Sequence, residues 1–343
     1  MYICDANLAA SGEENNRHKL GFVTFRLTRY GEESEKNGYL YPTFKDTDMD
    51  NQKKYAIGVD IGGSHICSAV VDLKTGNILG EPVNTPVDHT CSAEQIFSAW
   101  TENLRLVIGE AGVPVTQVGM AFPGPFDYEK GISWMEHKFV DIKGLNVGEI
   151  LQARMLEHRG LTFKFVNDAG AFALGESQFG AARDAKRVLV LTLGTGVGSG
   201  FIADHKIVRE GPQVPDGGEV WNLPFQDGIV DEAFSTRWVV KRYKELTGKE
   251  VQGAKDVALR YDIDNDAKQL FTEFGARLAE FTIPWLEKFE ARTLILGGNI
   301  ARSLPLFLQP MQRRYGQSGM EVTVKASVLL DKAAMMGAAS LFL

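Results

Sequence analysis

Beyond residue 54 the chain repeats one pattern, in which most of the short apolar runs end in glycine, asparagine or aspartate. Continuous apolar runs with such endings indicate buried strands. The runs cover residues 55–59, 66–72, 118–122, 162–166, 188–193, 293–296 and 322–324. Because helical periods separate many of them, the pattern predicts an α/β fold with mixed sheets flanked by helices.

The segments between the strands carry helix signals. Ser92 and Gln95 have the spacing of a capping box, and Ile96, Trp100 and Leu104 follow at helical intervals. Further helices are predicted near residues 147–158, within 234–243 and 270–285, and over 332–343, where small residues predominate.

The order of elements recurs in outline, since a strand–turn–strand unit opens at residue 55 and again at residue 188. This weak repeat predicts two similar lobes that face a cleft. We expect a small lobe of residues 54–167 with 328–343, and a large lobe of residues 168–327. Residues 1–53 are expected to lie outside this core.

The first 48 residues are polar and charged, with one strand-like piece near residues 21–27. Met49 precedes a polar segment that resembles a natural chain start. Our hypothesis is that residues 1–48 are a dispensable extension.

Composition narrows the functional classes. The net charge of −7 argues against a nucleic-acid-binding surface, and no apolar run reaches the roughly 18 residues of a membrane span. Cys4, Cys67 and Cys91 match neither a disulfide framework nor a metal knuckle. We expect a cytoplasmic protein that acts on a small molecule, without a nucleic-acid or membrane partner.

Two glycine-rich turns are candidate phosphate sites. In the first, Gly62, Gly63 and Ser64 offer backbone N–H groups to a phosphate, and Asp60 could order water around Mg²⁺. Taken alone, it could equally be a plain glycine turn.

The second turn contains Gly194, Thr195 and Gly196, with two further glycines at residues 198 and 200. Glycine costs a strand roughly 0.5–1 kcal/mol relative to alanine, so a structural role alone would rarely need four. The Thr195 hydroxyl could donate to a β- or γ-phosphate. The two turns would then hold a triphosphate from opposite sides.

Asn167 and Asp168 end a strand directly before a helix of small residues. Asp168 alone is explained as a helix N-cap. Phosphoryl transfer to an alcohol, however, requires a carboxylate that accepts the hydroxyl proton. Together with the two turns, this requirement favours Asp168 as a general base, with Asn167 on a sugar hydroxyl. Gly297, Gly298 and Asn299 also end a strand, and fit either a close approach to adenosine or a simple turn.

The chain from about residue 55 to its end resembles the ROK family of bacterial sugar kinases. The matching segments, in family order, are AIGVDIGGSH, FPGPFD, VNDAGAFALGE, VLTLGTGVGSGFI, GGNI and LLDKAAMMGAASLF. The resemblance implies a two-lobed actin-like ATPase, or ribonuclease-H-like, fold that holds nucleotide and sugar in the cleft between its lobes. It implies a glucokinase-like transfer from ATP, with Mg²⁺, to a sugar hydroxyl.

The resemblance also assigns residues. Asp168 takes the position of the base and Asp60 lies near Mg²⁺, while Thr195 and the glycines contact phosphate and residues 297–299 contact adenosine. Gly124, within FPGPFD, lies on the sugar side. A homodimer is the habit of the family.

Two segments depart from the family pattern. The family carries Glu-x-Gly-His and then a cysteine-rich zinc loop, whereas this chain has Glu219-Val220-Trp221-Asn222 and a short loop without cysteine. We therefore expect no zinc site. Glu219 and Glu232 match sugar-binding positions of the family, and Asn222 replaces its histidine. The segment 131–145 also differs and is expected to set sugar specificity.

A non-catalytic sugar sensor is the alternative. Repressors of the family carry an N-terminal helix-turn-helix, but Gly12, Gly21, Gly31, Gly38 and Pro42 interrupt any helical run in this extension. Retention of Asp168 and both turns favours the kinase.

Overall fold

The computed structural model describes residues 6–7, 23–29, 32–38, 54–158 and 160–343. The chain divides into two units, Met1–Asp48 and Met49–Leu343. In the first unit, β1 (Ala6–Asn7), β2 (Val23–Arg29) and β3 (Glu32–Gly38) form an antiparallel sheet in that order. The strand expected at 21–27 overlaps β2, although residues 21 and 22 lie outside the described residues, as does Met49.

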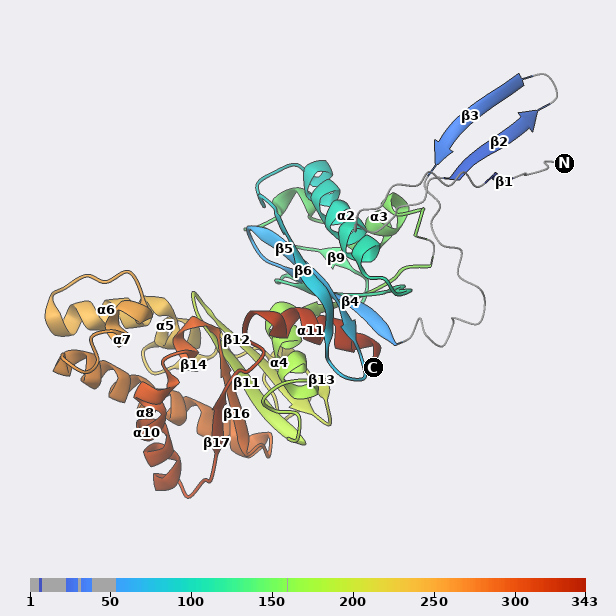
Figure 1. The fold of residues 1–343 in the computed structure, drawn as a ribbon. Helices are drawn as coiled ribbons and strands as arrows, with labels where there is room; N and C mark the ends of the chain where they lie inside the picture. Colours follow the sequence, from blue (N-terminus) through green and yellow to red (C-terminus); the bar gives the residue numbers. More distant parts are fainter. Residues whose placement is uncertain (1–5, 8–22, 30–31, 39–53, 159) are drawn as a thin grey trace, which may run out of the picture. The chain divides into compact units, whose positions relative to one another are not determined.

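The second unit begins with a five-stranded mixed sheet in the order β10-β7-β4-β5-β6. β4 and β5 form an antiparallel hairpin, and β7 and β10 run parallel to β4 (Figure 1). The strands are β4 (Tyr55–Ile61), β5 (His65–Asp72), β6 (Ile78–Pro86), β7 (Gln117–Phe122) and β10 (Thr162–Asn167). Their predicted positions are confirmed to within two residues at each end for the runs at 55–59, 66–72, 118–122 and 162–166.

One face of this first sheet is covered by α2 (Ala93–Glu110) and α3 (Val147–Arg154), whose apolar side chains pack on β4 and β7. Ser92 and Gln95 form the predicted capping box. The helix expected to reach residue 158 ends at Arg154 instead, because the buried Met155 leaves the helical region at φ −116° and ψ 43°.

A second five-stranded sheet has the order β13-β12-β11-β16-β17. β11 and β12 are antiparallel, whereas β16 and β17 run parallel to β11. The strands are β11 (Arg187–Leu193), β12 (Val197–Ala203), β13 (Lys206–Val208), β16 (Thr293–Gly297) and β17 (Thr323–Ala326).

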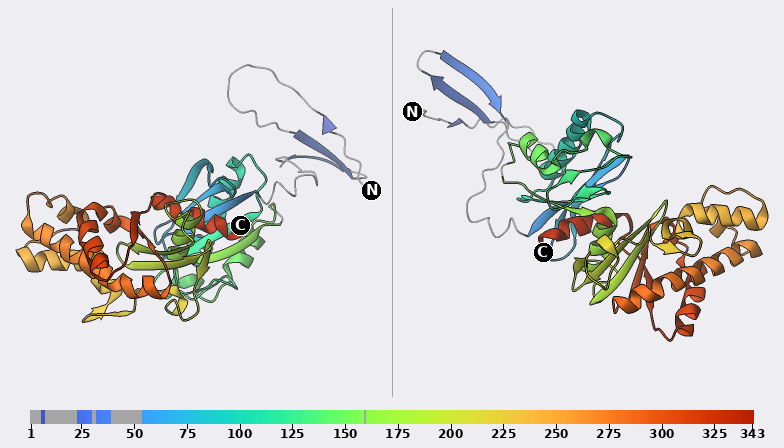
Figure 2. Two further views of the ribbon diagram at one scale, coloured as in Figure 1. Left: turned by 90° about the horizontal axis from the view of Figure 1, so that it is seen from below. Right: turned by 180° about the vertical axis from the view of Figure 1, so that it is seen from behind.

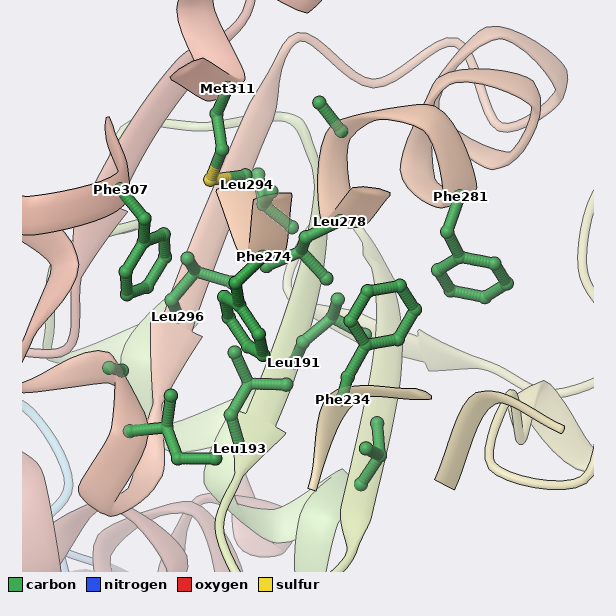
Figure 3. Packing of buried hydrophobic residues seen from close by; sticks show 14 of the residues in the cluster. Leu191, Leu193, Phe234, Phe274, Leu278, Phe281, Leu294, Leu296, Phe307 and Met311 are labelled. Atoms are coloured by element: carbon green, nitrogen blue, oxygen red, sulfur yellow. The ribbon is translucent and has the colours of Figure 1, made fainter. Parts of the chain in front are cut away.

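The helices beyond residue 230 bury one face of this sheet. Figure 3 shows leucines of β11 and β16 meeting Phe234, Phe274 and Leu278 in that core. The helices concerned are α5 (Val230–Phe234), α6 (Thr236–Thr247), α7 (Ala254–Ala258), α8 (Asn265–Lys288), α9 (Gly298–Ala301) and α10 (Leu304–Gln317).

Two short helices lie between the sheets, with α11 (Ala333–Ala339) on the first sheet and α4 (Asp168–Gln178) on the second (Figure 2). Their backbones touch, since a Cβ on Gly337 would lie 1.7 Å from the carbonyl oxygen of Ala171. A Cβ on Gly58 of β4 would lie 2.0 Å from the carbonyl oxygen of Met335. Glycine and alanine are therefore required here, because only small residues let the elements approach so closely.

The helix expected over residues 332–343 is broken into three pieces. 3-10 turns at Leu330–Lys332 and Ser340–Phe342 flank α11. The Ser340 hydroxyl donates to the carbonyl oxygen of Gly337 at 2.6 Å, a local side-chain bond that competes with the helical pattern. Among the described residues, no helix combines the length and apolar character needed to cross a bilayer.

Candidate active site

The turn between β4 and β5 presents unused backbone donors. The N–H of Gly62 donates to the carbonyl of His65 at 2.9 Å, but those of Gly63 and Ser64 have no acceptor among the described residues. Asp60, near the end of β4, also lacks a hydrogen-bond partner within that part of the chain. Burial raises its pKa to about 7, and the charges of Asp168 and Asp331 add to the effect.

The turn between β11 and β12 also has backbone donors without acceptors at its tip. The N–H of Gly194 donates to the carbonyl of Gly196 at 3.0 Å. The N–H groups of Thr195 and Gly196, and the exposed Thr195 hydroxyl, have no partner in the residues that the structure describes. Both predicted glycine turns therefore offer free donors to an anion.

The base of this second turn is held by the start of the helical region. Val197 N–H donates to Asp231 Oδ1 at 2.7 Å, and Asp231 forms an ion pair with Arg237. Thr236 donates both its N–H and its hydroxyl to the Gly194 carbonyl, at 2.8 and 2.9 Å. Asp231 was not singled out from the sequence, and only its position beside Glu232 pointed to it.

Asn167, rather than Asp168, caps α4. Its Oδ1 accepts from Gly170 N–H at 3.1 Å, and its Nδ2 donates to the Tyr128 hydroxyl at 3.3 Å. The interpretation of Asp168 as the N-cap is therefore wrong. Asp168 is the first residue of the helix, and its carboxylate accepts only the adjacent N–H of Ala169, at 2.8 Å.

The environment of Asp168 favours its protonated form. The carboxylate is in contact with solvent, yet dense protein surrounds it, and this desolvation raises its pKa above the ordinary value. The N–H of Ala169 and the charge of Lys138 oppose the rise, whereas the charge of Glu219 adds to it. A reactive carboxylate with a raised pKa and open access is suited to accept a proton.

A pocket of about 140 Å³ adjoins Asn167. Its polar lining includes Glu219, Arg209 and Tyr128, and the Arg209 guanidinium lies over the Tyr128 ring at 5.2 Å from the centroid. This volume is below the roughly 300–1,000 Å³ of drug-sized sites and suits a small molecule. The remaining lining residues are Gly170, Ser199, Gly200, Phe201, Ile207, Val208, Gly217 and Gly218.

The other residues predicted to bind sugar do not all line this pocket. Glu219 lines the pocket and accepts a hydrogen bond from the Trp221 indole at 2.9 Å. Gly124 is next to the pocket, since a Cβ there would lie 3.5 Å from the Tyr128 hydroxyl. Asn222 and Glu232 are not among the lining residues, and the Glu232 carboxylate accepts from Ile229 N–H at 3.3 Å.

Gly297 and Gly298 connect β16 to α9. Gly298 has a positive φ of 81°, and a Cβ there would lie 2.4 Å from the Leu193 carbonyl oxygen, so glycine is needed at this position. Gly298, the first residue of α9, thus adjoins the end of β11 directly before the second glycine turn.

The loop in the position of the family's zinc motif is held by an arginine. Arg277 of α8 lies over the rings of Phe225 and Trp238, at 5.4 and 5.3 Å from their centroids, and donates to Gln226. Phe225 belongs to β14 (Pro224–Phe225), which pairs with β15 (Gly228–Ile229). Within the described residues, no three His, Cys, Asp or Glu side chains gather as metal ligands.

Three residues at the pocket or near Asp168 were not predicted as site residues from the sequence. Tyr128 follows the FPGPFD segment directly, which was the available signal. Arg209 follows β13 and gave no sequence signal. Lys138 lies in the segment 131–145, where specificity was expected but no contact could be assigned.

Known proteins resemble this chain in sequence. Residues 56–343 match the sequence profile of the ROK family. A glucokinase of Streptomyces coelicolor is 28% identical over 324 residues, covering 83% of this chain and 96% of the relative. A β-glucoside kinase of Listeria innocua is 26% identical over 298 residues, with the same two coverages.

Solved structures match the fold. A ROK hexokinase from Thermus thermophilus aligns with a TM-score of 0.69 and 24% identity, over 83% of this chain and 97% of that one. A ROK family glucokinase from Streptomyces griseus, in complex with glucose and AMPPNP, aligns with a TM-score of 0.62 and 26% identity, over 84% and 98%. The predicted two-lobed, actin-like ATPase fold class is confirmed.

Proposed function

This chain belongs to the ROK family, and from that premise we propose that it transfers the γ-phosphoryl group of ATP to a hydroxyl of a hexose or hexose derivative. The observation that carries the proposal is the placement of Asp168. It is an accessible carboxylate with a raised pKa, beside a small pocket with polar groups in its lining and near Asp60, which precedes the first glycine turn. Named relatives that phosphorylate glucose and β-glucosides support the substrate class.

In the proposed reaction, Asp168 accepts the proton of the sugar hydroxyl while that oxygen forms a bond to the γ-phosphorus. The bond between the γ-phosphorus and the bridging oxygen breaks, and ADP leaves with its electron pair. Asn167 and Glu219 hold neighbouring hydroxyl groups, and Gly124 lies next to the same pocket. Asn222 and Glu232 do not line this pocket, and the family resemblance alone assigns them to the sugar. The two lobes, residues 54–167 with 328–343 and residues 168–327, close to exclude water.

The nucleotide is proposed to lie between the two glycine turns. Gly62, Gly63 and Ser64 on one side and Gly194, Thr195 and Gly196 on the other donate to phosphate oxygens, and adenosine lies against Gly297, Gly298 and Asn299. Free N–H groups in both turns support this assignment.

Asp60 fits a role in holding Mg²⁺ through water. Burial and the neighbouring carboxylates raise its pKa, which means that its ionised form is destabilised in the absence of a cation. A bound cation would stabilise that ionised form. Mg²⁺ commonly binds one or two carboxylates together with substrate phosphates, and supplies charge neutralisation there. We place the activity in the cytoplasm, where ATP is available and the free thiols of Cys67 and Cys91 stay reduced.

The test is an ADP-release assay with Mg-ATP over a panel of hexoses and amino sugars. We expect one acceptor class to be turned over, and Asp168→Asn to lower kcat by about 10²–10⁴-fold, the range for a general base, while sugar binding persists. Asp184→Asn is a matched control, because Asp184 is exposed and has no partner among the described residues.

Undiminished turnover by Asp168→Asn would refute the assignment of the base. Absence of any acceptor, combined with measurable sugar binding, would instead indicate a non-catalytic sugar sensor.

A further inference from the structure

The loop before the 3-10 turn Val140–Ile142 is fixed by two buried side chains. Met135 and Phe139 are 1% and 0% exposed, and the Phe139 ring contacts Trp100 edge-on at 5.4 Å. Phe139 N–H donates to the His89 carbonyl at 3.1 Å. Phe139 also adopts a left-handed conformation with φ 50°, which is rare for a bulky residue and is tolerated only where surrounding packing enforces it. Lys138 therefore projects from an anchored backbone.

Lys138 lies against the first glycine turn. Its Cε and Nζ are 3.5 and 3.6 Å from the position that a Cβ on Gly63 would occupy. The ammonium group is thus close to the backbone that presents the unused N–H groups of Gly63 and Ser64.

Lys138 has no carboxylate partner or hydrogen bond among the described residues. Lys143, only five positions further along, behaves like an ordinary surface lysine and pairs with Glu136 at 2.6 Å. An exposed lysine without a partner is unremarkable by itself. This one, however, is close both to the free donors at Gly63 and to the carboxylate of Asp168, whose pKa its charge lowers.

We propose that Lys138 binds the γ-phosphoryl group during transfer and is a further catalytic residue of the site. The proposal rests on the proposed kinase function and deepens it. The sugar oxygen attacks the γ-phosphorus as its proton passes to Asp168, and the bond to the bridging oxygen of ADP breaks. Charge on the transferred group is then shared by the Lys138 ammonium and the N–H groups of the turn.

The kinetic test compares three variants at saturating Mg-ATP over a range of sugar concentrations. Lys138→Met keeps the apolar stem and removes the charge, and we expect kcat to fall by about 10²–10³-fold, as when one preorganised donor is removed, with the KM for sugar nearly unchanged. Lys138→Arg should recover part of the loss, because it restores the charge. Lys143→Met is the matched control and should retain wild-type kcat. A Lys138→Met enzyme with wild-type kcat would overturn the proposal while leaving the kinase function intact.

A binding test separates this proposal from the kinase assignment, since it needs no sugar. Titration calorimetry with Mg·AMPPNP and Mg·ADP would be run on the wild type and on Lys138→Met. Contact with the γ-phosphoryl group predicts about tenfold weaker binding of AMPPNP and unchanged binding of ADP. Equal effects on both nucleotides, or no effect on either, would reject the contact even if no sugar acceptor had been found.

Discussion

The two glycine turns have similar tips but differ in what holds them. The turn at Gly194–Gly196 is braced from below, because Asp231 accepts the Val197 N–H and Thr236 donates twice to Gly194. The turn at Gly62–Ser64 has no side-chain brace of this kind among the described residues, and from outside the hairpin only Val87 N–H reaches it, donating to the Ser64 carbonyl at 3.0 Å. Its acidic neighbour, Asp60, has no partner in the same part of the chain. The one lysine against it, Lys138, is equally unpaired there.

This difference gives two ways of preparing the proposed phosphate sites. In the second turn, Asp231 bonds to Val197 N–H and pairs with Arg237, so its carboxylate is already satisfied. The free donors of that turn are therefore held in place without a ligand. In the first, Asp60 and Lys138 keep unsatisfied charge, which a bound cation and phosphate would complete. We therefore expect substitutions at the first turn to affect catalysis, and substitutions at the brace of the second to affect stability and nucleotide affinity.

The largest expected effect is at Asp60. Asp60→Asn removes the proposed support of Mg²⁺, and we expect kcat with Mg-ATP to fall by at least about 10²-fold, because several kcal/mol of charge stabilisation are lost. The measurement is the ADP-release assay, with Asp184→Asn as the control. Retained activity would mean that the first turn does not depend on its unsatisfied carboxylate.

The same substitution has a pH signature in unfolding experiments. The pKa of Asp60 is raised from 3.8 to about 7 in the folded state, so the folded protein binds more protons than the unfolded chain between these values. Asp60 thus favours the folded state below about pH 4, and this contribution is lost as the pH rises through 7. Urea unfolding without nucleotide should show Asp60→Asn gaining stability over the wild type from pH 5 to pH 8. A constant difference would contradict the raised pKa.

Asp231→Ala should act through stability. It leaves the Val197 N–H without its acceptor, which costs about 1–3 kcal/mol for a buried donor, and it loosens the second turn, so the KM for ATP should rise. Arg237→Met is the informative control, because it removes the ion pair and the bond from Arg237 to the Thr195 carbonyl at 3.2 Å but keeps the bond to Val197. Arg237 is 60% exposed, and such pairs contribute only about 0–1 kcal/mol. Equal destabilisation by the two variants would show that the contacts of Arg237, rather than the bond between Asp231 and Val197, hold the turn.

Local patterns predicted the frame of the site. Both glycine turns, the capping box at Ser92 and the strand ends at Asn167 and Gly297 are found as expected, because glycine spacing, capping residues and apolar runs act over a few positions. The N-cap of α4 is an exception at this scale, because Asn167 caps the helix and Asp168 does not. Two adjacent polar residues can each cap a helix, and only the backbone decides which one does so.

What the sequence could not predict depends on distant contacts. Asp231 meets Val197 across 34 positions, and Lys138 meets Gly63 because packing of Phe139 directs its loop. The pocket residues Tyr128 and Arg209 lie on separate segments, one between β7 and α3 and the other directly after β13. No periodicity or spacing rule relates such pairs, so they appear only once the chain is folded.

The smallest expected effect comes from alanine substitutions at Gly63 and Gly196, one in each turn. Neither Gly63 nor Gly196 has a positive φ, so alanine is acceptable to the backbone at both. A Cβ at Gly63 would make ordinary contacts with Lys138, whereas at Gly196 it would lie 2.8 Å from Asp231 Oδ1 and displace the brace. Gly63→Ala should be neutral or stabilise by up to about 1 kcal/mol, since alanine restricts the unfolded chain, and Gly196→Ala should destabilise by about 1 kcal/mol. Urea midpoints measure both, and equal shifts would mean that the two turns are braced alike.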